Sequence, residues 1–125
     1  MPLPERVERG LVVGKFCPLH RGHERLIDFA ATRCRALLVI SWSQPGFAGY
    51  SAARRERWLR ARFPQATVAV LDDARLAALC EQHGLPPRVL PRDDDSEQAQ
   101  RDFTAWLCLH LSGGPVQVVF TGEDY

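Results

Sequence analysis

The chain has 125 residues, the size of one globular domain, with 46% hydrophobic and 25% charged residues. This balance excludes a disordered chain, and a formal net charge of only +1 gives no support for nucleic acid or an anionic membrane as a partner. No segment reaches the roughly 20 apolar residues of a membrane span, and the charged, proline-broken amino terminus does not resemble a signal peptide. The four cysteines form no CxxC pair, which favours free thiols. We therefore expect a cytoplasmic protein.

Short apolar runs alternate with helical patterns along the chain. The first run, Leu11-Val12-Val13, ends at a glycine, and the later runs are also bounded by glycine, proline or polar residues. We expect strands over residues 9–16, 36–40, 67–71 and 116–120. We expect helices over residues 20–35, 52–63, 73–83 and 97–111. Ser51 and Ser96 are the expected N-caps of the second and fourth helices, and Gly84 ends the third.

This alternation predicts one α/β domain over residues 1–125. Strands that are apolar almost throughout are typical of a parallel sheet with helices on both faces. Right-handed crossovers then produce a Rossmann-like, doubly wound parallel sheet. Ligands of such sheets bind beyond the carboxyl ends of the strands, near the point where the strand order reverses.

The loop after the first predicted strand, GKFCPLHRGH (residues 14–23), carries residue types suited to binding phosphate. Gly14 lets the backbone approach a ligand closely, Pro18 stiffens the turn, and Gly22 leaves room beside a phosphate. The helix that follows presents free N–H groups and a positive dipole end to an anion. His20 and His23 share one side of its first turn, where both can donate to the same phosphate.

Two alternatives exist for these histidines. Histidines in loops are often simply solvated. Cys17, His20 and His23 could also be three ligands of a metal ion, although zinc would need a fourth ligand from elsewhere and the paired CxxC spacing is missing. Neither alternative explains why both histidines follow the first strand and open the first helix.

The same ten residues resemble a known signature. GKFCPLHRGH matches the G-x-F-x-P-x-H-x-G-H pattern of the nucleotidyltransferase superfamily with the HxGH motif. The resemblance implies that His20 and His23 contact a nucleoside triphosphate and stabilise charge on its α-phosphorus. No side chain attacks in that family; a phosphate oxygen of the acceptor displaces pyrophosphate in line, and Mg²⁺ bridges the phosphates of ATP. The nucleotide-binding residues that the resemblance implies are Gly14, Lys15, Phe16, Pro18 and Gly22.

Two further segments resemble one branch of this superfamily. Ser51-x-x-x-Arg55-x-Arg57-Trp58-Leu59 is similar to a helix of nicotinamide-nucleotide adenylyltransferases. Residues 121–125, TGEDY, are similar to the T-S-E-x-Y segment of bacterial bifunctional members, with glycine in place of serine. The implied reaction joins ATP and nicotinamide mononucleotide to give NAD and pyrophosphate.

The acceptor contacts that we expect are Trp42, Arg55 and Arg57, while Trp58 is expected in the core because it lies on an apolar stripe. A solvated helix face is the alternative for the arginines. A polar chain end is the alternative for residues 123–124.

Members of the superfamily also carry I-S-x-[ST]-x-x-R beyond the fourth strand, and no segment here matches it. The chain therefore resembles the amino-terminal part of a longer enzyme. We expect it to fold, to bind triphosphate weakly and to turn over little; sustained NAD synthesis by this chain would contradict that expectation. The unbuilt side of the crevice should leave apolar surface that favours self-association or a partner chain.

Two other functions compete with this prediction. One is cytidylyl or adenylyl transfer to another small phosphate, such as glycerol phosphate or phosphopantetheine. The other is a non-catalytic module that binds nucleotides for regulation. A dehydrogenase is disfavoured, because no GxGxxG follows the first strand.

Overall fold

The computed structural model describes residues 7–14, 16, 21–42, 49, 51–92, 94–111 and 116–120. In chain order these residues form β1 (Val7–Val13), α1 (Arg21–Arg33), β2 (Cys34–Trp42) and α2 (Ala52–Arg62). They continue with β3 (Thr67–Leu71), α3 (Asp73–Gln82), α4 (Glu97–Leu111) and β4 (Val118–Phe120).

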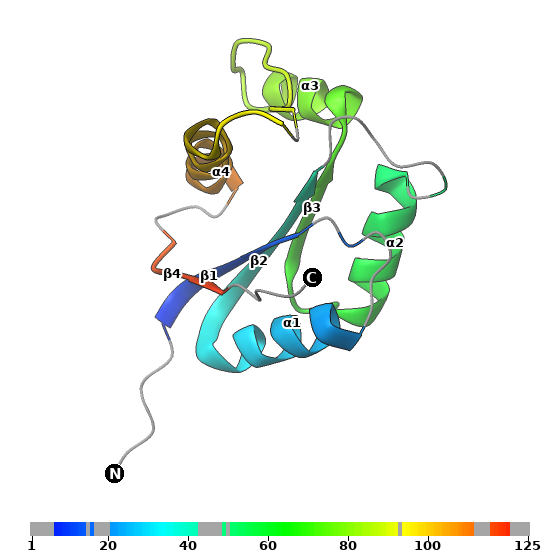
Figure 1. Cartoon of the computed structure of the whole chain (residues 1–125), viewed down its shortest axis with the longest axis vertical. Helices are drawn as coiled ribbons and strands as arrows, with labels where there is room; N and C mark the ends of the chain where they lie inside the picture. The colour runs from blue at the N-terminus through cyan, green and yellow to red at the C-terminus, as the bar shows by residue number, and fades with distance from the viewer. Residues whose placement is uncertain are drawn as a thin grey trace.

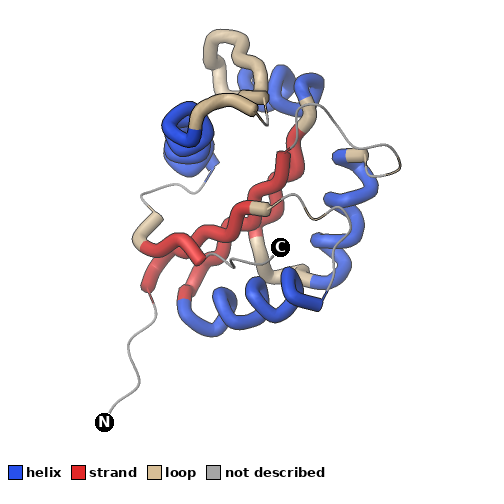
Figure 2. The backbone as a smooth tube through the Cα atoms, in the orientation of Figure 1, coloured by secondary structure: helices blue, strands red, loops and turns tan. Residues whose placement is uncertain are grey.

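The strands form one parallel sheet in the order β3-β2-β1-β4. Helices α1 and α2 lie on one side of the sheet, and α3 and α4 lie on the other (Figure 1). The tube in Figure 2 shows the same three layers, with the strands between two groups of helices. The predicted Rossmann-like, doubly wound sheet is therefore confirmed. The strand order also identifies the reversal point, since β2 and β4 lie on opposite sides of β1.

Each face of the sheet has its own hydrophobic core because successive strand residues point to opposite faces. In β2, Leu37 and Val39 pack toward α1 and α2, while Leu38 and Ile40 pack toward α3 and α4. All four are buried, with 6% exposure or less. A buried side chain of this size contributes about 1.5–3 kcal/mol, so the two cores account for much of the fold's stability.

The helix caps expected from the sequence are formed. The hydroxyl of Ser51 accepts a hydrogen bond from the backbone N–H of Arg54 at 3.1 Å, and Ser96 accepts one from Ala99 at 3.1 Å. Gly84 has φ +65°, a conformation that costs glycine little, and its N–H donates to the carbonyl of Glu81. The next N–H, from residue 85, donates to the Cys80 carbonyl, which completes a Schellman motif at the end of α3.

Several element boundaries differ from those expected. β1 covers Val7–Val13 rather than residues 9–16, and Phe16 has φ +52°, which no strand residue adopts. β2 extends to Trp42 rather than ending at residue 40. The first helix ends at Arg33 rather than at residue 35, and β2 starts at Cys34. Cys34 is 3% exposed, pairs with Val7 of β1, and donates from its Sγ to the Ala30 carbonyl at the end of α1. Burial of this side chain therefore sets the change from helix to strand. The fourth strand begins at Val118 rather than at residue 116.

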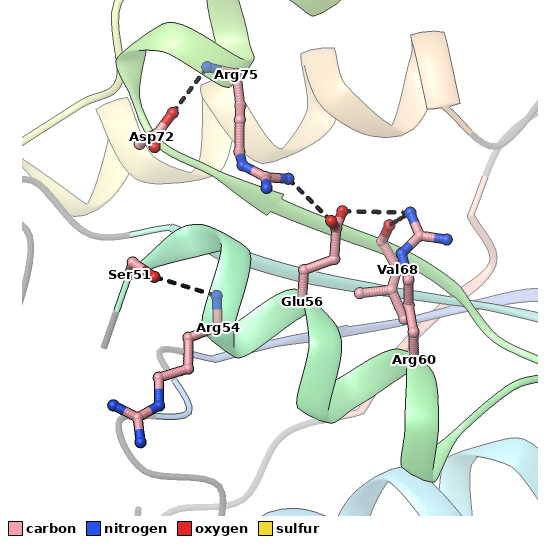
Figure 3. A network of polar contacts seen from close by, with 7 residues as sticks. All are labelled: Ser51, Arg54, Glu56, Arg60, Val68, Asp72 and Arg75. Carbon is pink, nitrogen blue, oxygen red and sulfur yellow. Dashed lines mark hydrogen bonds and ion pairs between the residues drawn. The ribbon is translucent and has the colours of Figure 1, made fainter. Parts of the chain in front are cut away.

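Strand β3 is an edge strand that charged side chains cover. Arg60 of α2 donates to the carbonyl of Val68 in β3 at 3.2 Å (Figure 3). Glu56, also on α2, accepts from Arg60 at 3.3 Å and from Arg75 of α3 at 3.0 Å. This network joins helices from the two faces of the sheet around its edge, and charged cover of this kind protects an edge strand from pairing with another chain.

Apolar side chains are exposed near the opposite edge. Val119 of β4 is 55% exposed, and Phe29 of α1 is 50% exposed while its ring lies edge-on to Phe120. Self-association through such surface stays a prediction. Among the described helices, none combines the length and the apolar character that crossing a membrane requires.

Candidate functional site

The candidate site lies at the carboxyl end of the central strand β1. The N–H of Gly14, immediately after β1, donates to the carbonyl of Ile40 in β2 at 3.1 Å. This bond keeps the end of β1 attached to β2 where the chain leaves for α1. The strands β2 and β4 lie on opposite sides of β1, and a doubly wound fold binds its ligand at the carboxyl end of the strands near such a reversal.

Gly14 and Phe16 form a close-packed pair at this end. A Cβ added to Gly14 would lie 2.8 Å from Cε1 and Cζ of the Phe16 ring, so only glycine leaves space for that ring. Phe16 itself has φ +52°, a left-handed conformation that costs a residue with a side chain about 1–2 kcal/mol. Its ring is 1% exposed and belongs to the core between the sheet and α1. The sequence predicted a ligand beside Gly14, whereas the described neighbour of Gly14 is the Phe16 ring.

His23 lies in the first turn of α1 and is 5% exposed. The Phe16 ring stands edge-on to the imidazole, with 5.0 Å between the centroids and an interplanar angle of 90°. The predicted alternative of a simply solvated histidine is therefore wrong for His23. Its burial next to the end of β1 comes from its position four residues before the buried Ile27 on the same helix face.

Several expected site residues lie outside the described residues: Lys15, Cys17, Pro18, His20 and residues 121–125. Gly22 is exposed in the first turn of α1, and its place beside a ligand phosphate stays a prediction. A shared phosphate between the two motif histidines stays a prediction. Among the described residues, no three His, Cys, Asp or Glu side chains gather to hold a metal ion.

A buried arginine and serine form a second polar feature near the carboxyl end of β2. Arg55 is 2% exposed and Ser41 is fully buried. Nη1 of Arg55 donates to Oγ of Ser41 at 2.7 Å, which joins the first half of α2 to the end of β2. The structure thus places the Arg55 side chain in the interior. The sequence had suggested that Arg55 binds an acceptor phosphate or lies on a solvated helix face. Contact between Arg55 and an acceptor stays a prediction.

The sequence contains signals that could have predicted the contact between Arg55 and Ser41. Arg55 lies four residues before Leu59 and three after Ala52, both buried, so it belongs to the buried stripe of α2. Ser41 alternates with Leu37 and Val39 toward the same face of the sheet. A polar residue on each facing element predicts a buried hydrogen bond.

The other proposed acceptor contacts lie in different surroundings. Trp42 is 7% exposed and packs edge-on to Phe103 of α4, with 5.1 Å between centroids, so it belongs to the core on the α3 and α4 side. Arg57 is exposed on α2. Trp58, expected in the core, is only half-buried, and the Arg54 guanidinium lies 5.3 Å from its ring. Of the three residues suggested for the acceptor, only Arg57 has an exposed side chain.

Charged side chains and a helix dipole lie at the start of α1. α2 has no acidic residue in its first turn, and α1 has only Glu24 in its own. Arg62 of α2 pairs with Glu24 at 3.1 Å and with Asp28 at 2.9 Å, so one guanidinium is shared between two carboxylates of α1. The N-terminal end of α1 also carries the positive end of the helix dipole, which attracts anions.

The described cysteines are buried in the two cores of the sheet. Cys34 belongs to the core with α1 and α2, and Cys80 and Cys108 belong to the core with α3 and α4. Cys17, which belongs to the motif loop, lies outside the described residues. Burial away from water disfavours a thiolate and raises the pKa of the Cys108 thiol. These thiols are core residues.

No family model matches the chain, and no curated protein matches it at a significant level. The resemblance to the HxGH nucleotidyltransferases therefore stays a prediction that depends on the residues of the motif.

Proposed function

We propose that the protein is a nucleotidyltransferase that transfers the adenylyl group of ATP to nicotinamide mononucleotide. One observation carries the proposal: His23 of the HxGH string opens α1 directly beyond the carboxyl end of the central strand. A doubly wound fold binds ligands at that end. The residue types of the string and the location of its described residues both support a phosphate ligand.

The proposed reaction is a single in-line displacement. A phosphate oxygen of nicotinamide mononucleotide attacks the α-phosphorus of ATP, and the bond from that phosphorus to the oxygen bridging to the β-phosphate breaks. NAD forms, and pyrophosphate leaves with the electron pair of the broken bond. The protein positions the two phosphates and stabilises the charge that accumulates between them.

The described residues suit this work. The start of α1 supplies N–H groups and a positive dipole end for the triphosphate. His23 supplies an imidazole donor in the same turn, and His20 is proposed as its partner. Magnesium arrives with ATP as part of the substrate and bridges its phosphates. For the acceptor, Arg57 offers an exposed guanidinium that suits a phosphate.

Calorimetric titration with Mg–ATP tests the nucleotide site. We expect wild-type protein to bind Mg–ATP and His23→Ala to bind it about 10- to 150-fold more weakly, the factor for one lost charge-assisted hydrogen bond. His83→Ala is the matched control, because His83 caps the far end of α3 and is exposed. Equal affinity of wild type and His23→Ala for Mg–ATP would remove His23 from the site. If the wild type held one metal ion per chain and His23→Ala did not, the nucleotide site would have to be reinterpreted as a metal site.

Pyrophosphate release tests the acceptor. Nicotinamide mononucleotide should support more release from ATP than glycerol 3-phosphate or phosphopantetheine does. Equal release with glycerol 3-phosphate would contradict the nicotinamide assignment, and a preference for CTP would favour cytidylyl transfer. Binding of Mg–ATP without release for any acceptor would instead favour a regulatory nucleotide-binding module.

A further inference from the structure

We propose that Phe16 is a positioning residue that holds the imidazole of His23 in its working orientation. The effect of this positioning on nucleotide binding rests on the function proposed above. The contact itself stands on the packing of three residues, Gly14, Phe16 and His23, at the carboxyl end of β1.

The first step of the argument is that Phe16 belongs to the interior. It was expected among the nucleotide-binding residues, yet its side chain is 1% exposed and packs with the core that contains Val12 and Ile27. A side chain so deeply buried has little surface with which to contact a nucleotide. Its influence on a ligand must therefore pass through a neighbour.

The second step is that the backbone holds Phe16 in an unusual conformation. At φ +52° the Cβ crowds the backbone, so this conformation persists only when surrounding contacts hold it. The Phe16 ring provides such contacts by filling the space over Gly14, where a Cβ would meet it at 2.8 Å. The pair therefore determines where the ring lies.

The third step is that this ring meets His23 in a directional contact. The two rings are perpendicular, with 5.0 Å between centroids, an arrangement that aromatic pairs favour over a face-to-face sandwich. A perpendicular ring against an imidazole restricts rotation about the bonds of the histidine side chain. Restriction of this kind directs the imidazole N–H before a ligand arrives, which is how a preorganised donor gains strength.

Nuclear magnetic resonance of the histidine rings tests the contact without any nucleotide. Phe16→Leu keeps an apolar residue but removes the ring, so the ring proton shifts of His23 should change and its tautomer balance should move. Phe103→Leu is the matched control, because Phe103 is also 1% exposed and lies edge-on to Trp42 on the other face of the sheet. It should lower stability by a similar amount and leave the His23 signals unchanged. His23 signals that are the same in folded Phe16→Leu as in wild type would overturn the proposal.

Phe16→Met serves as a second variant if Phe16→Leu does not fold. Methionine retains most of the apolar volume and lacks the ring, so it should produce the same change in the His23 signals. Unchanged signals in this variant would overturn the proposal in the same way.

A double-mutant cycle with Mg–ATP tests the consequence for binding. We expect Phe16→Leu to weaken Mg–ATP binding about fivefold in the wild-type background and less than about twofold in the His23→Ala background, since coupled residues are not additive. An equal loss in both backgrounds would show that Phe16 does not act through His23. A separate outcome is that the wild type and all variants fail to bind a nucleotide while the His23 signals still respond to Phe16→Leu. In that case the proposed function fails and the positioning contact stands.

Discussion

The hydrogen bond between Arg55 and Ser41 should contribute measurably to stability. Ser41→Ala removes the hydroxyl that accepts from Nη1 of Arg55 at 2.7 Å, at a place where both side chains are at most 2% exposed. Water cannot easily replace the lost acceptor there. Hydrogen bonds to charged groups contribute about 1.5–3 kcal/mol. Because the guanidinium retains other contacts, we expect a loss of about 2 kcal/mol in the free energy of unfolding.

Urea unfolding followed by circular dichroism measures this loss. The midpoint should fall while the slope with denaturant stays constant, because the surface exposed on unfolding is unchanged. A loss of 2 kcal/mol corresponds to a fall in Tm of about 8 °C for a domain of this size. The same substitution in an Arg55→Met background should cost less than about 0.5 kcal/mol, since the buried charge is then gone.

Ser96→Ala is the matched control, because Ser96 is exposed and caps α4 through a hydrogen bond of 3.1 Å. It should cost about 1 kcal/mol, the usual contribution of an N-cap, whether or not Arg55 is present. The reasoning fails if Ser41→Ala stays within 0.5 kcal/mol of wild type, or if its effect is the same in both backgrounds.

Two further predictions concern backbone conformation and a buried thiol. Gly84→Ala should lower the free energy of unfolding by about 1–2 kcal/mol, because φ is +65° and no atom lies near the added Cβ, so conformational strain is the whole effect. Thermal and urea unfolding measure it, and an unchanged midpoint would contradict the reasoning. Burial raises the pKa of Cys108 above its ordinary value of 9.0, so the folded state keeps its proton at a pH where the unfolded chain loses it. The contribution of the protonated thiol to stability is therefore present below pH 9 and is lost as the pH rises beyond it. The difference in free energy of unfolding between wild type and Cys108→Ala should become smaller above pH 9. A difference that stays constant from about pH 7 to about pH 10 would contradict the raised pKa.

The elements themselves were predictable because their signals are local. Four apolar runs and four helical patterns lie where the sequence placed them, and the caps at Ser51 and Ser96 and the glycine at position 84 act as expected. These features depend on alternation, spacing and turn chemistry within a few residues. The parallel, doubly wound arrangement followed from the alternation of strands and helices. The misplaced boundary at Cys34 shows the limit, because that residue joins β2 through its contacts with Val7 and Ala30.

The candidate site was predictable in position but not in detail. The motif string follows the first strand, and the general rule for parallel sheets assigns a ligand to that end. The rule does not say which side chains face the ligand and which face the core. Contact of Phe16 and Gly14 with the nucleotide stays a prediction, and the packing of the Phe16 ring over Gly14 was not indicated by the sequence.

The sequence by itself determined the order of strands and helices, their capping and the end of the sheet on which the HxGH string lies. Only the tertiary structure decided that Arg55 and Ser41 meet in the interior, that Trp42 packs against Phe103, and that Phe16 contacts His23. The physical reason is that hydrophobic periodicity and turn chemistry act between residues near in sequence. These contacts join different elements, and their geometry depends on how the helices and strands pack against one another in the close-packed interior.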